Sequence, residues 1–83
     1  NDIGSWGQIA ALHDQDADGN AARLGVGGRH IAIETRDTFV YSTTGRVIAT
    51  AGVSDLVIVD TGDALLVCQR EQAQLVKQIS EQI

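Results

Sequence analysis

The chain has 83 residues, a formal net charge of −5 and a single cysteine, so we expect one small domain without a disulfide framework. The acidic balance, with no cluster of Lys and Arg, argues against nucleic acid and anionic membrane surfaces as partners. No apolar run reaches membrane-spanning length, and the lack of disulfide pairs favours a cytoplasmic protein. The chain does not begin with Met, and we interpret it as part of a longer protein.

A short helix is predicted over residues 5–13. Ser5 and Gln8 fit a capping box. In this motif the serine hydroxyl accepts a hydrogen bond from one unpaired backbone amide, and the glutamine side chain accepts one from another. Trp6 and Ile9 then lie on one face at helical spacing, which indicates core contacts rather than a ligand site.

The polar segment after this helix contains the start of a calcium-loop pattern. Asp14, Asp16 and Asp18 are spaced to place oxygens around a cation. The twelfth position should be a bidentate glutamate, but it is Gly25. We therefore interpret residues 14–20 as an ordinary turn.

A glycine-rich stretch follows over residues 25–28. A dinucleotide fingerprint would need a third glycine at position 30, which is His30, and no Gly-Lys-Ser or Gly-Lys-Thr is present. We interpret the stretch as a flexible connection. His13 and His30 have no second ligand type at zinc spacing and are expected to be surface or half-buried residues.

From His30 onward the pattern is one of short strands separated by glycine turns. The run Val57-Ile58-Val59 is too uniformly apolar for a strand with one solvent-exposed face, so it predicts a strand covered on both faces. Three apolar runs begin with an aspartate: Asp37, Asp55 and Asp63. The first two lie 18 residues apart, one coil of a β-helix built from six-residue repeats, whereas the last two lie only 8 apart. The spacing favours a stacked coil and leaves a small open sheet as the alternative.

The last predicted element is a helix over residues 71–82. Leu75, Ile79 and Ile83 recur at i, i+4 and i+8 with Val76 beside them, which is typical of a packing face. No good N-cap residue precedes the helix. Cys68, at the end of an apolar run, is expected to be a small buried hydrophobe rather than a reactive thiol.

Several motifs, in this order, resemble the C-terminal part of the mannose-1-phosphate guanylyltransferase family. The motifs are Asp2-Ile3-Gly4-Ser5-Trp6, Asp18-Gly19-Asn20, Thr38-Phe39-Val40-Tyr41-Ser42, Gly45-Arg46-Val47-Ile48-Ala49 and the block from Gly52 to Val67. The resemblance implies a mainly β fold: a short left-handed β-helix-like coil of short strands, flanked by an N-terminal and a C-terminal helix. Residues 1–13 would be the tail of the catalytic nucleotidyltransferase domain, and residues 14–83 the β-helix-like domain with its closing helix.

The resemblance also implies a reaction. In that family mannose 1-phosphate attacks the α-phosphorus of GTP in the presence of Mg²⁺, giving GDP-mannose and pyrophosphate. Asp2 matches the aspartate of the family's Asp-x-Gly motif and would be a catalytic residue and metal ligand. The residues alone leave a second interpretation open for Asp2, an ordinary strand-to-helix turn, because a carboxylate at such an edge fits both.

The nucleotide loop and the sugar-binding residues of the family are absent from this chain. We therefore expect the 83 residues to lack transferase activity and to serve domain packing and homodimer contacts. GTP and mannose 1-phosphate would bind through the missing N-terminal domain. The alternatives are a stand-alone β-rich oligomerisation module and a nucleotidyltransferase for another sugar 1-phosphate.

Overall fold

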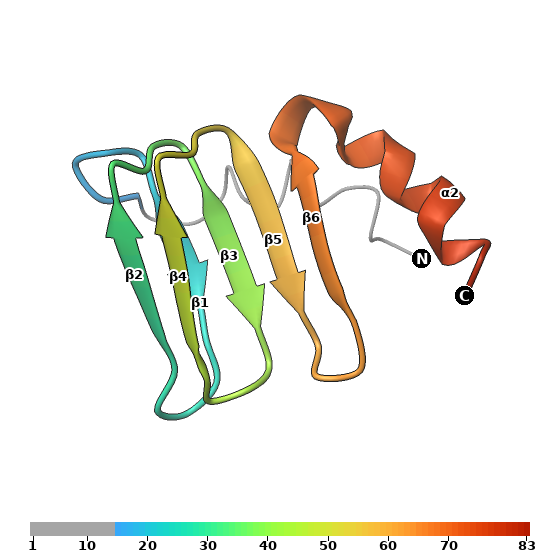
Figure 1. Cartoon of the computed structure of the whole chain (residues 1–83), viewed down its shortest axis with the longest axis horizontal. Coiled ribbons are helices and arrows are strands. Elements are labelled where there is room, and N and C mark those ends of the chain that lie inside the picture. The colour runs from blue at the N-terminus through green and yellow to red at the C-terminus, as the bar shows by residue number, and fades with distance from the viewer. Residues whose placement is uncertain (1–14) are drawn as a thin grey trace.

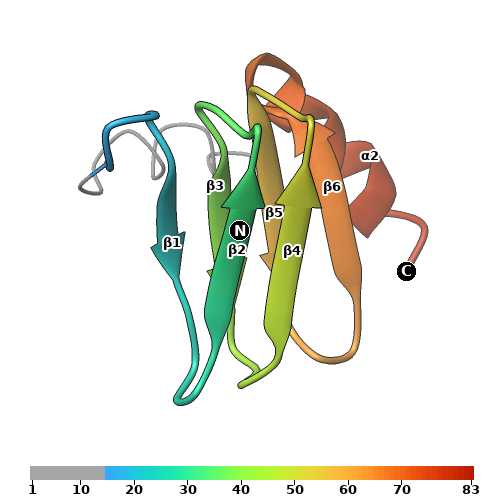
Figure 2. The same cartoon turned by 60° about the vertical axis from the view of Figure 1, so that its left-hand side comes forward.

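The computed structural model describes residues 15–83, which form a short β-helical coil closed by a helix (Figure 1). The predicted helix over residues 5–13, with Trp6, lies outside the described residues. Six strands form two sheets, which face each other in Figure 2. One has the order β1-β3-β5-β6 and the other pairs β2 with β4. The strands are β1 (Ala21–Arg23), β2 (Arg29–Ile33), β3 (Phe39–Ser42), β4 (Val47–Ala51), β5 (Leu56–Asp60) and β6 (Leu65–Gln69).

Every parallel pair in the two sheets joins residues that are 18 positions apart. In the larger sheet Phe39 pairs with both Ala21 and Val57, and in the smaller sheet Arg29 pairs with Val47. A bridge between Arg36 and Ser54 continues the same register through the corner. The spacing prediction is therefore confirmed. Successive turns of the chain stack strand on strand, and the two sheets that they build do not close on each other.

The third aspartate-led run departs from this register. β6 runs antiparallel to β5, with Ile58 opposite Val67. The turn of this hairpin is closed by a hydrogen bond of 3.1 Å from the Thr61 amide to the Ala64 carbonyl oxygen. Gly62 supplies the positive φ of 90° within the turn. The spacing of 8 residues thus marks a reversal, and within residues 15–83 β4 has β2 as its one strand partner.

The largest buried cluster follows the ladder of the larger sheet, on the face where Leu66 and Cys68 of β6 also pack. Ala21, Phe39 and Val57 are buried one above another, and Val59 extends the cluster. Within β5, residues Val57, Ile58 and Val59 are only 0%, 6% and 7% exposed. The predicted strand with two covered faces is confirmed.

Aspartate occupies the corners of the coil. Gly19, Asp37 and Asp55 lie 18 residues apart, and all have a positive φ (79°, 51° and 60°). Aspartate is one of the few side chains that visit this conformation routinely, because its short polar group bonds locally. Asp37 and Asp55, which open the first two apolar runs, are therefore corner residues of successive turns.

The C-terminal helix differs from its prediction. It begins as a 3₁₀ helix, η2 (Arg70–Leu75), with a break at Gln72, and continues as α2 (Val76–Ser80). The buried residues are Ala73 and Val76, whereas Leu75, Ile79 and Ile83 are 44%, 43% and 91% exposed. The predicted packing face is therefore confirmed at Val76 and wrong at Leu75, Ile79 and Ile83, which remain largely exposed.

Candidate functional site

The predicted catalytic and metal-binding residue, Asp2, lies outside the described residues. Across residues 15–83 no three His, Cys, Asp or Glu side chains gather in a way that could hold a metal ion. Oδ1 of Asp16 accepts the amide protons of Asp18 and Asn20 at 2.9 Å each. This oxygen caps a turn, as the sequence predicts, and is not directed at a cation.

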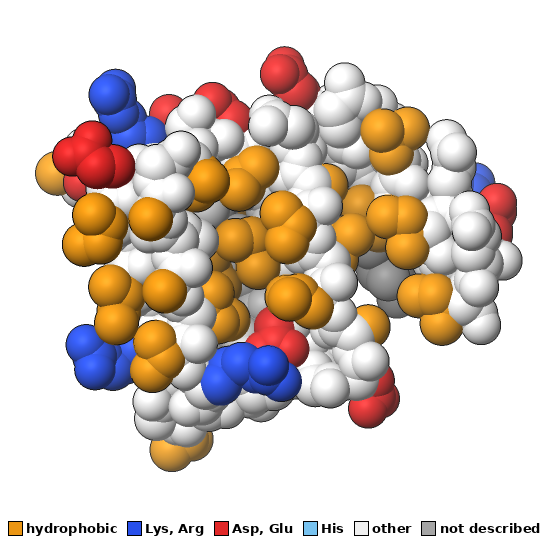
Figure 3. Space-filling view, viewed as in Figure 1, with side chains coloured by type: hydrophobic (Ala, Val, Ile, Leu, Met, Phe, Trp, Pro, Cys, Tyr) orange, Lys and Arg blue, Asp and Glu red, His pale blue; other side chains and the backbone are white. Residues whose placement is uncertain are grey.

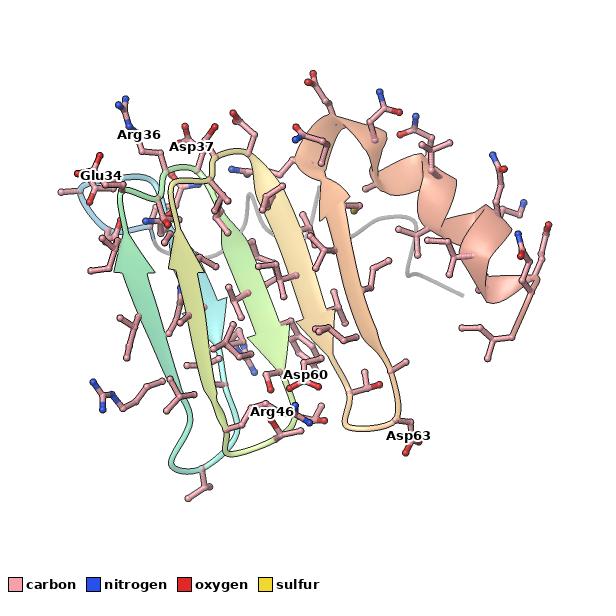
Figure 4. All side chains as sticks on the ribbon, viewed as in Figure 1. Glu34, Arg36, Asp37, Arg46, Asp60 and Asp63 are labelled. Carbon is pink, nitrogen blue, oxygen red and sulfur yellow. The ribbon has the colours of Figure 1, made fainter. Side chains whose placement is uncertain are left out.

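A polar cleft of about 510 Å³ lies along one corner of the coil. Figure 4 shows Glu34, Arg36 and Asp37 side by side at this end, with their side chains directed outward. The cleft carries charges of both signs. Its lining residues are Glu34, Arg36, Asp37, Gly52, Val53, Ser54 and Asp55.

A buried carboxylate lies at the opposite end of the strands (Figure 4). Asp60 is 2% exposed, and its Oδ2 accepts hydrogen bonds from the hydroxyls of Ser42 at 3.0 Å and Thr44 at 2.9 Å. Nε of Arg46 lies 3.1 Å from the same oxygen, and the amide of Gly62 donates to Oδ1 at 3.1 Å.

Two opposing effects act on the pKa of Asp60. Burial raises the pKa. The hydrogen bonds from the Gly62 amide and from the Thr44 and Ser42 hydroxyls, together with the Arg46 charge, lower it, and their combined effect is the larger one. The net pKa lies below its usual value, so the group is an anion at neutral pH. All of its strong partners are protein groups, and its role is to join the ends of β3 and β5. Sequence reasoning missed this cluster because its members are spread along the chain.

A second polar chain crosses the inside of the coil at His30. Thr35 donates its one hydroxyl proton to the Ile33 carbonyl at 3.0 Å. Thr50, 2.9 Å away, must therefore donate to Thr35, and Nε2 of His30, 2.9 Å from Thr50, must donate to Thr50. Burial lowers the pKa of His30, an effect that the charge of Asp16 opposes. His30 is half-buried, as predicted, and its role is structural.

The glycine-rich stretch is not merely a flexible connection. A side-chain carbon on Gly25 would lie 2.6 Å from the Thr44 carbonyl oxygen, and one on Gly45 would lie 2.5 Å from that of Val26. The glycines thus let the corner loops of successive turns stack in backbone contact.

Cys68 is half-buried against the core cluster, and burial raises the pKa of its thiol. A raised pKa leaves little thiolate, the reactive form. The prediction of an inert hydrophobe fits this environment.

Two apolar surfaces are exposed in residues 15–83. A groove of about 340 Å³ runs between β6 and α2, with Leu66, Val76 and Ile79 among its lining residues. The outer face of β2 and β4 exposes Ile31, Ile33 and Val47 at 36%, 58% and 51% (Figure 3). In the described part of the chain, no helix has the length and apolar character needed to cross a membrane.

Comparison with known proteins gives consistent matches. A family model described as MannoseP isomerase/GMP-like beta-helix domain matches residues 28–83. Mannose-1-phosphate guanylyltransferase of Escherichia coli is 36% identical over all 83 residues. The xanthan biosynthesis protein XanB of Xanthomonas campestris is 37% identical over the same length.

A solved structure matches the fold as well. The crystal structure described as mannose-1-phosphate geranyltransferase from Thermus thermophilus superposes with a TM-score of 0.78 over 99% of this chain, at 35% identity. The chain covers 24% of that protein, 17% of the E. coli relative and 16% of XanB. It corresponds to the C-terminal part of those relatives.

Proposed function

The chain belongs to the MannoseP isomerase/GMP-like β-helix domain family, and we propose that it is the C-terminal domain of an enzyme that transfers GMP from GTP to mannose 1-phosphate, giving GDP-mannose and pyrophosphate. The observation that supports this is the match of all 83 residues to the C-terminal part of an E. coli guanylyltransferase at 36% identity. The β-helical fold shared with the Thermus protein agrees with it.

In this proposal the described residues position the enzyme and do not perform its chemistry. The described residues gather no metal-binding cluster and expose two apolar surfaces, which supports this assignment. We assign them to packing against the catalytic domain and to homodimer contacts in a cytoplasmic enzyme. Asp2 would hold Mg²⁺ beside the substrate phosphates, where the ion offsets negative charge that develops during phosphoryl transfer.

The test compares the 83-residue chain with the longer protein that contains it, by measuring GDP-mannose formation from GTP and mannose 1-phosphate. We expect the longer protein to be active and the isolated chain to be inactive. Asp2→Ala in the longer protein should lower kcat by orders of magnitude with the fold intact. Asp63→Ala, which removes an exposed carboxylate from the β5–β6 turn, is the matched control and should leave kcat unchanged.

The outcomes separate the competing functions. A longer protein that prefers another sugar 1-phosphate would be a nucleotidyltransferase of different specificity. A longer protein without any nucleotidyl transfer would point to an oligomerisation module. Activity of the isolated chain, or normal turnover of Asp2→Ala, would contradict the roles assigned here.

A further inference from the structure

The outer face of the two-stranded sheet is apolar beyond Arg29, the first residue of β2. Side chains alternate along each strand, so Ile31 and Ile33 of β2 lie on the same face as Val47 of β4, and all three are exposed. Hydrophobic side chains gather over β2 and β4 at the left of Figure 3. Ala49 and Ala51 lie beside the isoleucines, and their small side chains project less far from the sheet. We call these five residues the isoleucine face.

Charges flank the isoleucine face at its two ends, and the end beyond β2 carries Arg36 and Asp37 besides Glu34. Arg29 is the first residue of β2, and Glu34 follows its last residue. Both are exposed, and β4 carries no charge. A face with a cation at one end and an anion at the other is complementary to a copy of itself turned end over end.

The spacing of the bulky side chains agrees with that orientation. If Arg29 of one copy lies level with Glu34 of a second, antiparallel copy, Ile31 falls between Ile31 and Ile33 of that copy. The isoleucines of the two faces then interdigitate instead of colliding, as side chains do between packed sheets about 10 Å apart. The same registry therefore satisfies both the charges and the shapes.

We propose that two copies of this chain pack their isoleucine faces together about a two-fold axis perpendicular to the strands. This inference rests on the proposed role of the domain in homodimer contacts, to which it assigns a surface and an orientation. The parallel arrangement is disfavoured, because it brings the two Arg29 side chains to one end and the two Glu34 side chains to the other.

The expected association is weak in the isolated chain. Each copy contributes two five-residue strands, a smaller contact than the roughly 800 Å² per partner of a standard stable interface. Each copy also has a net charge of −5, which opposes association at low ionic strength. The dimer should therefore form with rising protein concentration and more readily at moderate salt.

Sedimentation equilibrium of the 83-residue chain over a range of concentrations tests the proposal. We expect a monomer–dimer equilibrium whose Kd rises at least about 100-fold in Ile31→Asp, because Ile31 lies nearest the two-fold axis in this registry and the change buries an unpaired charge there. Val26→Asp is the control, since Val26 is fully exposed in a corner loop, away from the face. It should leave the Kd unchanged.

Charge exchange tests the orientation and uses variants that leave the apolar residues in place. Arg29→Glu and Glu34→Arg should each raise the Kd about tenfold, since each places like charges opposite one another. The double variant restores opposite charges and should return the Kd to within about threefold of the original. Circular dichroism of each variant checks that the coil remains folded.

Several results would overturn the proposal. One is a chain that stays monomeric at every concentration, which would assign the isoleucine face to another part of the longer protein or to another partner. Others are an Ile31→Asp variant that still dimerises, and a double charge variant that associates no better than the single ones. If Ile83→Asp abolished dimerisation and the change on the isoleucine face did not, the contact would lie at the groove beside α2. None of these measurements depends on GDP-mannose formation, so this inference and the proposed function fail separately.

Discussion

At the scale of single residues, Asp60 accepts the hydrogen bonds that hold one end of the coil together, and it makes the stability of the fold depend on pH. Its pKa in the folded protein lies below the ordinary value, so the unfolded chain binds the proton first as the pH falls. The stabilisation by Asp60 is complete above the unfolded pKa of about 4 and is lost as the pH falls through the folded pKa.

We expect Asp60→Asn to lower the melting temperature at pH 7 by several degrees and to flatten the loss of stability below about pH 4. The amide cannot replace the anion beside Arg46. Thermal unfolding between pH 2 and pH 8 measures both effects, with Asp63→Asn, in the exposed turn of the same hairpin, as the control. Identical pH profiles for the two variants would contradict the role given to Asp60.

Gly45 provides the second prediction at this scale. An added methyl group would meet the Val26 carbonyl oxygen at 2.5 Å, and a backbone atom in a stacked loop has little room to move. Gly45→Ala should therefore cost about 1–3 kcal/mol of unfolding free energy, the range for overpacking. Gly52→Ala meets open space at a positive φ of 67° and isolates the backbone strain of about 1–2 kcal/mol. Urea unfolding separates the two costs, and an unaffected Gly45→Ala would show that the loops can part.

At the scale of elements, the closing helix gives a prediction that differs from its sequence pattern. Val76 is 2% exposed, whereas Ile79 is 43% exposed. We expect Val76→Ala to cost about 1–2 kcal/mol, since it removes two buried methyl groups, and Ile79→Ala to cost less than about 0.5 kcal/mol. Chemical denaturation of both variants measures the difference. Equal losses would restore the stripe of Leu75, Ile79 and Ile83 as the packing face.

The elements also show how far the sequence determines the fold. The offset of Asp37 and Asp55 predicts the coil because corner residues recur once per turn, and the run at Val57 predicts a fully covered strand. The reversal at Gly62 and the 3₁₀ start of the helix were not predictable, because each depends on tertiary contacts that a local pattern does not contain. The Asp60 cluster was missed for the same reason. The isoleucine face could have been found from the alternation of residues 29–33 and 47–51.

At the scale of the whole molecule, the two sheets should differ in local stability. β3 and β5 each have strand neighbours on both sides, whereas β2 and β4 pair only with each other in the described coil. Hydrogen exchange should therefore be slowest for the amides of β3 and β5 and at least about tenfold faster in β2 and β4. Exchange measured by NMR tests this ranking, and uniform protection would indicate a single cooperative unit.

The reversal at β6 has a consequence for how such a domain changes length. Because the hairpin and helix close the C-terminal end, a further turn cannot simply be appended after Gln69 without displacing them. A duplication of residues 38–55, in contrast, repeats one complete turn with its corner residues in register. Such an insertion would lengthen the coil by one strand spacing of about 4.8 Å and carry the closing hairpin and helix outward as one piece. The 18-residue turn is thus a unit of growth, and β6 is the stop that keeps growth internal.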